Sequence, residues 1–227
     1  MTAARRRAVR GALAPYAALG ARVRAHTAIR WISAPLAEVE SLIPRRGRIL
    51  DFGCGHGLLS LVAARGAPRR SVHGVDVDEA KIEAARRAAG AAGLGGRATF
   101  DVVDGGWRPD PGSFDVVLVT DVLYLLGPEA ALDAVSMLAR AVRPGGRLLI
   151  KEMAPAPRWK VRVNLLQERL AIDVVGYTKG AAVAPVPIGA LAERVRAEGF
   201  GVTVRRLDRG YPHPHAIVVA DRVQAGA

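Results

Sequence analysis

The stretch from Arg48 to Leu61, RILDFGCGHGLLSL, restricts the possible folds more than any other part of the chain. Ile49 and Leu50 end a short apolar run that is typical of a buried parallel strand, and Leu58 begins an apolar helical pattern. Between strand and helix stand three glycines at alternate positions: Gly53, Gly55 and Gly57. Glycine lets a backbone bend sharply and lets a ligand approach it closely. The segment therefore predicts a strand, a glycine turn and a helix that together hold a ligand.

The turn differs from the fingerprint of dinucleotide-binding proteins. That fingerprint, G-x-G-x-x-G, requires a glycine at position 58, where this chain has Leu58. Asp51 lies two residues before the first glycine, and its carboxylate suits a cationic ligand better than a phosphate. The pattern thus favours a positively charged ligand over a pyrophosphate.

Acidic residues follow the next predicted strands. A second strand ends at Asp76, about 20 residues beyond the glycines, where an acid accepts hydrogen bonds from ribose hydroxyls. Asp78 is the expected N-cap of the helix that follows, and the same role is the alternative for Asp76. A third strand is followed by Asp104 and Gly105, and a fourth ends at Thr120 and Asp121.

In this order and spacing, the motifs resemble those of the class I S-adenosylmethionine-dependent methyltransferases, over roughly residues 45 to 222. The family's acid-x-Gly-x-Gly-x-Gly motif matches the segment that begins at Asp51, its ribose acid matches Asp76, and its adenine-contacting acid matches Asp104. A Pro-Gly-Gly turn typical of the family is present at 144–146. The resemblance implies S-adenosylmethionine as cofactor, S-adenosylhomocysteine as product, and these cofactor-binding residues: Asp51, Gly53, Cys54, Gly55, Gly57, Asp76, Val77, Asp104, Gly105 and Asp121.

The alternation of strands and helices from 48 to 152 predicts a parallel α/β sheet with right-handed crossovers. The resemblance implies a Rossmann-like sheet of seven mostly parallel strands with helices on both faces, whose last strand runs antiparallel between the fifth and the sixth. We expect an N-terminal helical cap over residues 1–44, a methyltransferase domain over 45–227, and a helical insertion at about 154–186.

Candidate catalytic residues follow from the ends of the strands. Ligands of such sheets bind outside the carboxyl ends of the parallel strands, where Asp121 and Glu152 end the fourth and fifth strands. His213 and His215 lie in a turn before the last strand, on the same edge. As general bases for a hydroxyl acceptor we consider His215, Glu152, Asp121 and His213. The two histidines are equally consistent with packing, and they lack a third partner for a metal, so no metal site is predicted.

The insertion at about 154–186 places apolar residues at helical spacing, with basic residues around them. It is either a helix that covers the core or, as the resemblance implies, a substrate lid that suits an amphipathic or acidic acceptor. The candidate substrate-binding residues are Arg30, Trp31, Tyr124, Arg158, Trp159, Asn164, Gln167 and Glu168.

The net charge of +12 is concentrated near the N-terminus, because residues 1–48 hold ten Arg and two Glu, which gives 10 − 2 = +8. The excess has three explanations: a general preference for arginine (29 Arg against 4 Lys), an anionic membrane surface or substrate, or RNA. The segment Thr120-Asp121-Val122-Leu123-Tyr124 lacks the Asn/Asp-Pro-Pro-aromatic motif of many enzymes that methylate bases on nitrogen. The one cysteine, Cys54, lies in the wrong loop for a cytosine C5 enzyme.

The sequence thus favours O-methylation of a small, hydrophobic or acyl-bearing, lipid-like metabolite. An RNA methyltransferase guided by the basic arm, and a cofactor-binding module without catalysis, are the alternatives. No apolar run approaches the length of a transmembrane helix, and the arginine-rich start lacks the apolar core of a signal peptide. We expect a cytoplasmic monomer or homodimer, with peripheral contact to anionic membranes as an option.

Overall fold

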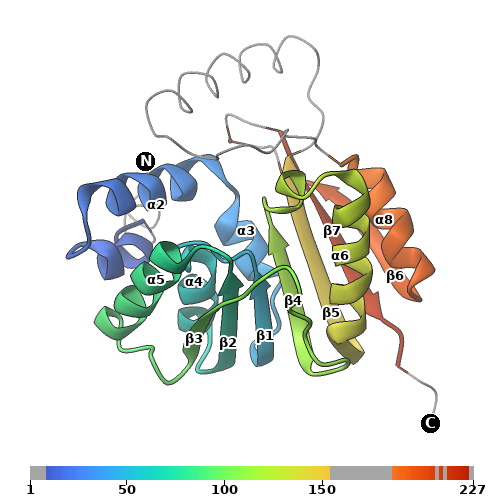
Figure 1. Ribbon diagram of the computed structural model, residues 1–227, viewed down its shortest axis with the longest axis horizontal. Helices are drawn as coiled ribbons and strands as arrows, with labels where there is room; N and C mark the ends of the chain where they lie inside the picture. Colours follow the sequence, from blue (N-terminus) through green and yellow to red (C-terminus); the bar gives the residue numbers. More distant parts are fainter. Residues whose placement is uncertain (1–8, 154–185, 208–209, 212–213, 225–227) are drawn as a thin grey trace.

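The computed structural model describes residues 9–153, 186–207, 210–211 and 214–224. Its centre is a seven-stranded sheet of order β3-β2-β1-β4-β5-β7-β6 (Figure 1). β7 runs antiparallel to both of its neighbours, and the other pairs are parallel. The predicted Rossmann-like sheet, with its last strand between the fifth and sixth, is therefore confirmed. The strands are β1 (Arg46–Phe52), β2 (Arg69–Asp76), β3 (Ala98–Val102), β4 (Phe114–Thr120), β5 (Val142–Met153), β6 (Phe200–Arg206) and β7 (His215–Arg222).

Helices cover the two faces of the sheet through separate apolar cores. α4 (Leu58–Gly66) and α5 (Glu79–Ala91) pack against β1, β2 and β3 on one face. On the other face α6 (Pro128–Ala141) and α8 (Ile188–Ala197) pack against β4, β5 and β7. The central strand β4 is apolar on both faces because both cores use it, which explains its continuous run of buried valines and leucine. Asp78 caps α5 as predicted, since its side chain accepts a hydrogen bond from the Lys81 amide at 3.1 Å.

The N-terminal segment forms η1 (Ala14–Tyr16), α2 (Ala21–Ser33) and α3 (Leu36–Ser41). Pro15 lies in η1, and Pro35 immediately precedes α3, so the prolines begin elements rather than interrupt them. Tyr16, Leu36 and Val39 are buried in the core that also holds α4 and α5. Figure 1 shows α2 at the end of the sheet where the parallel strands have their carboxyl ends. The boundary of a separate cap at residue 44 stays a prediction.

The chain between β3 and β4 departs from the expected alternation of strands and helices. Residues 103–113 connect the two strands without a helix. This segment, VDGGWRPDPGS, holds three glycines and two prolines, and both residue types disfavour helix. It encloses, with the strands β1, β2 and β3, a hollow of about 420 Å³.

Several predicted residues lie outside the described part of the chain. The insertion at about 154–186 is described only at its last residue, so the substrate-binding roles of Arg158, Trp159, Asn164, Gln167 and Glu168 stay predictions. The same applies to His213. Within the described ranges, no helix combines the length and the apolar character that a bilayer crossing requires.

Candidate functional site

The glycine turn between β1 and α4 uses each glycine for a different purpose. Gly53, Gly55 and Gly57 all have positive φ, at 70°, 54° and 72°. A Cβ on Gly53 would lie 2.5 Å from Val122, and one on Gly57 would lie 2.8 Å from the ring of Phe100. A Cβ on Gly55 would have nothing within 4 Å. Packing therefore requires glycine at the first and third positions, whereas Gly55 borders open space that a ligand can occupy.

Asp76 lies against this turn at the end of β2. Its Oδ2 accepts the amide hydrogen of Gly55 at 2.8 Å, and its Oδ1 accepts that of Asp78 at 3.0 Å. Because each carboxylate oxygen has two lone pairs, both can accept a further bond from a ribose hydroxyl. Val77, the next residue, has an apolar side chain that is 72% exposed. A carboxylate beside an uncovered apolar surface suits a nucleoside, with its ribose on Asp76 and its base on Val77.

Asp51 is a buried carboxylate beneath the turn. It is 2% exposed, and Ser60 at the start of α4 donates a hydrogen bond to its Oδ2 at 2.5 Å. Burial and the nearby charge of Asp76 raise the pKa of Asp51 to about 6, and the Ser60 bond limits that rise. A cation bound above the turn would favour the ionised form. The electrostatics of the turn thus fit a cationic ligand.

The remaining predicted cofactor residues border the same turn. The amide of Cys54 donates to the carbonyl oxygen of Val75 at 3.0 Å, which joins the turn to β2. Burial, with Asp51 and Asp76 nearby, raises the pKa of the Cys54 thiol, so it is no thiolate nucleophile. The amide of Val103 donates to the Asp76 carbonyl oxygen at 3.0 Å, which brings the exposed pair Asp104 and Gly105 to this edge.

Asp121, just after β4, is the centre of a buried ion-pair network. Lys151 of β5 is 0% exposed and donates to Oδ1 of Asp121 at 2.6 Å and to Oδ2 at 2.5 Å. Arg30 of α2 donates to Oδ2 at 2.7 Å. Burial alone would raise the pKa of Asp121, but the charges of Arg30 and Lys151 outweigh burial and lower it. Asp121 is therefore a weak base, and Arg30 joins the N-terminal segment to the edge of the sheet.

Glu152 is the next residue along β5, and it points to the opposite face of the sheet. It is 5% exposed, and its Oε1 accepts the amide hydrogens of Val122 at 3.2 Å and Leu123 at 3.0 Å. Burial and the charge of Asp121 raise the pKa of Glu152 to about 7, although the two amide bonds oppose the rise. A carboxylate with a pKa near neutrality can both accept and release a proton at physiological pH.

His215 begins β7, as predicted, and is 3% exposed. Its Nε2 lies 2.8 Å from the carbonyl oxygen of Ser33 at the end of α2. Because a carbonyl oxygen only accepts, Nε2 carries the hydrogen, and a base role would fall to Nδ1. His215 pairs with Met153 in the sheet, so its side chain and that of Glu152 point to opposite faces. The catalytic role of His215 stays a prediction.

Contacts from η1 and α2 reach the glycine turn itself. The Tyr16 hydroxyl donates to the carbonyl oxygen of His56 at 2.8 Å, and the rings of His26 and His56 lie 4.8 Å apart. Burial, followed by the charges of His56 and Arg30, lowers the pKa of His26 to about 4. With Arg30 on Asp121 and Ser33 on His215, α2 contacts the glycine turn after β1, the residue after β4 and the first residue of β7. Of the other predicted substrate residues, Trp31 packs partly buried against the core and Tyr124 lies in η2 (Leu123–Leu125).

Sequence reasoning missed four residues of this edge: Tyr16, His26, Ser60 and Lys151. Lys151 gave a signal, because it is a lone cation in the apolar run that precedes Glu152. Such a cation needs a buried counter-charge, and Asp121 supplies it. Tyr16 and His26 gave none, since their roles depend on where the N-terminal segment packs.

Comparisons with known proteins agree with this geometry. Residues 49–146 match a family model described as a methyltransferase domain. The Nocamycin O-methyltransferase of Saccharothrix syringae is 34% identical over 179 residues, which are 72% of this chain and 62% of that protein. An O-methyltransferase family protein from Burkholderia thailandensis has a similar structure, with a TM-score of 0.68, 24% identity, and coverage of 94% of this chain and 63% of that one.

A further solved structure, the S-adenosylmethionine-dependent methyltransferase SibL in its apo form, gives a TM-score of 0.67 at 26% identity. The match covers 89% of this chain and 58% of SibL. The chain thus spans less than two thirds of the length of each of these three relatives.

Proposed function

We propose that this chain, which belongs to the class I S-adenosylmethionine-dependent methyltransferases, transfers the methyl group to an oxygen atom of a small, hydrophobic or acyl-bearing metabolite. Support for oxygen as acceptor comes from relatives that are named O-methyltransferases. Support from the site itself comes from Glu152, a buried carboxylate with a pKa of about 7 beside the cofactor edge. An acceptor hydroxyl needs a base, and Glu152 has the affinity for a proton that this task requires.

The residues around the glycine turn fit the cofactor. Asp76 would hold the ribose hydroxyls, Val77 and Asp104 would lie against the adenine, and Asp51 would favour the positive charge. Gly55 leaves open space in which the cofactor can lie against the turn. When bound, the cofactor supplies an electrophilic methyl group on a sulfonium.

The chain's own part in the reaction is to position the acceptor and to accept its proton. The amides of Val122 and Leu123 fix Oε1 of Glu152, so the carboxylate has a set orientation before the acceptor arrives. Burial at the edge excludes water from the proton transfer. Arg30 is paired with Asp121 but its side chain is 32% exposed, so it would be available to an acidic group of the acceptor at this edge.

The test is a methyl-transfer assay with Glu152→Gln. The amide oxygen of Gln can still accept the two backbone bonds, so the fold is retained while the base is lost. We expect turnover to fall about 10²- to 10⁴-fold, the usual contribution of general acid–base catalysis. In the wild type, turnover should rise with pH through about 7, because Glu152 must be ionised, and the variant should lose this rise. Acceptors can be found by incubating hydrophobic acids and phenols with isotopically labelled cofactor and identifying labelled products by mass spectrometry.

Two controls accompany this assay. Glu193→Gln changes an exposed glutamate on α8 and should leave turnover unchanged. His215→Gln separates the two candidate bases: if it removes the pH dependence and Glu152→Gln does not, the base is His215. Label found only on nitrogen or carbon of the product would contradict O-methylation.

A further inference from the structure

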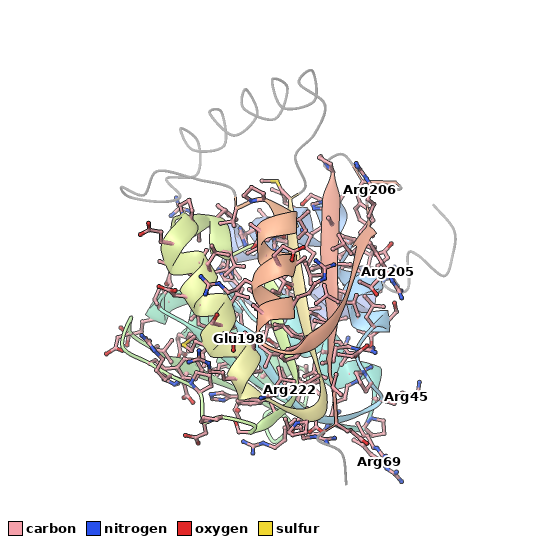
Figure 2. All side chains as sticks on the ribbon, turned by 90° about the vertical axis from the view of Figure 1, so that its right-hand side faces the viewer. Arg45, Arg69, Glu198, Arg205, Arg206 and Arg222 are labelled. Carbon is pink, nitrogen blue, oxygen red and sulfur yellow. The ribbon has the colours of Figure 1, made fainter. Side chains whose placement is uncertain are left out.

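Three arginines gather at the amino ends of β1 and β2, the end of the sheet opposite to the cofactor edge. Arg45 precedes β1, Arg46 begins it, and Arg69 begins β2. Arg45, Arg46 and Arg69 line a hollow of about 390 Å³ together with Pro44, Ala67 and Pro68. Figure 2 shows the side chains of Arg45 and Arg69 extending outward in the lower part of the molecule, below Arg205 and Arg206.

Two of these arginines are direct neighbours across the sheet. Arg46 and Arg69 are paired residues of the parallel strands β1 and β2, so their side chains leave the same face. Arg48, two residues further along β1, is on that face as well. Like charges opposite each other on adjacent strands repel and destabilise a sheet. The pair is therefore unfavourable unless a negative charge lies between its members.

No protein carboxylate supplies that charge in the described part of the chain, where the guanidinium groups of Arg45, Arg46 and Arg69 form neither hydrogen bond nor ion pair. The neighbouring arginine Arg70 differs, because its side chain is buried on Glu40 at 2.5 Å and on backbone carbonyl oxygens. The nearby carboxylate of Asp115 binds Arg143 at 2.6 Å and the Arg48 amide at 2.7 Å. The arginine cluster thus keeps its full donor capacity for a ligand from solution.

We propose that Arg45, Arg46 and Arg69 form a binding site for a phosphate group that carries more than one negative charge. The guanidinium fork matches the spacing of phosphate oxygens and binds them through paired hydrogen bonds. Three such forks around one hollow suit a pyrophosphate or a phosphate monoester better than a single carboxylate. The phosphate belongs to a free phosphorylated molecule or to a lipid headgroup, and both present the same chemistry to the cluster.

The site is independent of methyl transfer. It lies at the amino ends of the strands, whereas Asp51, Asp76 and Glu152 lie at the carboxyl ends. A ligand on the cluster would tether or recruit the protein without entering the cofactor site.

The test measures binding of inorganic pyrophosphate to the full chain by calorimetry, with Arg46→Gln/Arg69→Gln as the variant. We expect binding by the wild type and a loss of about tenfold or more in the variant, because each charge-assisted bond contributes on that scale. The control is Arg205→Gln, which removes an arginine near the carboxyl end of β6, outside the cluster, and should leave pyrophosphate affinity unchanged. Affinity for S-adenosylmethionine, measured on the same samples, should be equal in all three proteins.

Thermal unfolding gives a second readout, which does not require a dissociation constant to be measured. In chloride alone, the double variant should unfold at the same temperature as the wild type or higher, since it has lost a repulsion. When pyrophosphate is added, the unfolding temperature of the wild type should rise more than that of the variant. Vesicles with phosphatidic acid, whose headgroup is a phosphate monoester, compared with pure phosphatidylcholine, decide the source: binding that requires Arg46 and Arg69 assigns the site to lipid headgroups.

The proposal is overturned if the wild type binds neither pyrophosphate nor anionic vesicles. It is also overturned if Arg205→Gln weakens binding as much as the double variant does, because the effect is then one of net charge. Failure here leaves the methyl-transfer proposal untouched, since the cofactor measurements report on that site separately.

Discussion

At the carboxyl end of the sheet the charges of Asp121 and Lys151 are buried, with the partly exposed Arg30 within hydrogen-bonding distance of Asp121, whereas at the amino end Arg46 and Arg69 face each other with the same charge. Both clusters join adjacent strands. One is complete without any ligand, and its geometry is fixed by its own side chains. The other lies at the surface, and the repulsion between its arginines depends on whether an anion from solution binds there.

The two clusters illustrate two kinds of site: one whose geometry is fixed before a ligand binds, and one whose charge a ligand must balance. Burial and the charge of Asp121 raise the pKa of Glu152, and the bonds of Asp121 to Arg30 and Lys151 orient the edge before any substrate binds. Such preorganisation favours catalysis. The amino end is suited to reversible attachment, because its arginines exchange water for a ligand at little structural cost.

The largest expected effect comes from breaking the buried network. Asp121→Asn keeps the size of the side chain and tolerates the positive φ of 52° at this position, but it leaves Lys151 buried without its counter-charge. We expect the free energy of unfolding to fall by about 3–5 kcal/mol, measured by urea denaturation.

The matched control is an exposed ion pair on the same sheet. Asp221→Asn removes the partner of Arg147, and the Asp221 side chain is 59% exposed, against 6% for Asp121. The loss should be below about 1 kcal/mol. Equal losses for Asp121→Asn and Asp221→Asn would show that burial of the network contributes nothing.

The next largest effects are expected for two glycines of the turn, whose substitutions should act differently. Gly57→Ala places a Cβ 2.8 Å from the Phe100 ring at a positive φ, and should lower the free energy of unfolding by about 2–4 kcal/mol. Gly55→Ala meets no protein atom and should cost about 1 kcal/mol of strain. Its main effect should be weaker binding of S-adenosylmethionine. If calorimetry finds cofactor affinity unchanged in Gly55→Ala, the ligand does not occupy the space beside Gly55.

The smallest effect is the dependence of cofactor affinity on pH. Asp51 has its pKa raised from the usual 3.8 to about 6, so it loses its charge as the pH falls through 6. Affinity for a cationic ligand should therefore rise between pH 5 and pH 7, by up to about tenfold, which corresponds to one pKa unit of mutual stabilisation. Titrations of Asp51→Asn should show a flatter profile. An identical profile would assign the dependence to another group.

Local sequence patterns were sufficient to predict the strands, the glycine turn and the acidic residue that surround the cofactor site. The glycine spacing, the acid at Asp76 and the apolar run of β4 each depend on neighbours within one strand–turn–helix unit, and such units can be predicted from pattern. The absence of a helix between β3 and β4 could also have been predicted from the glycines and prolines of 103–113. It was missed because a regular alternation of strands and helices was assumed.

The chemistry of the edge was harder to predict because it depends on contacts between distant residues. Arg30 and Asp121 are 91 positions apart, and Ser33 and His215 are 182 apart. Alternation along β5 decides that Lys151 meets Asp121 on one face while Glu152 points to the other. Nothing in the local pattern showed that the carbonyl oxygen of Ser33 would take the hydrogen of His215 Nε2.

The most direct test of the cofactor site is a calorimetric titration of the wild type and Asp76→Ala with S-adenosylmethionine, beside a titration with NAD. Asp76 contacts the turn at Gly55 and would accept bonds from the ribose, so its loss should weaken S-adenosylmethionine binding by about 1–3 kcal/mol. The wild type should bind S-adenosylmethionine and show no comparable affinity for NAD. Unchanged affinity in Asp76→Ala would limit that residue to capping the turn. Tighter binding of NAD than of S-adenosylmethionine would contradict the assignment of the site.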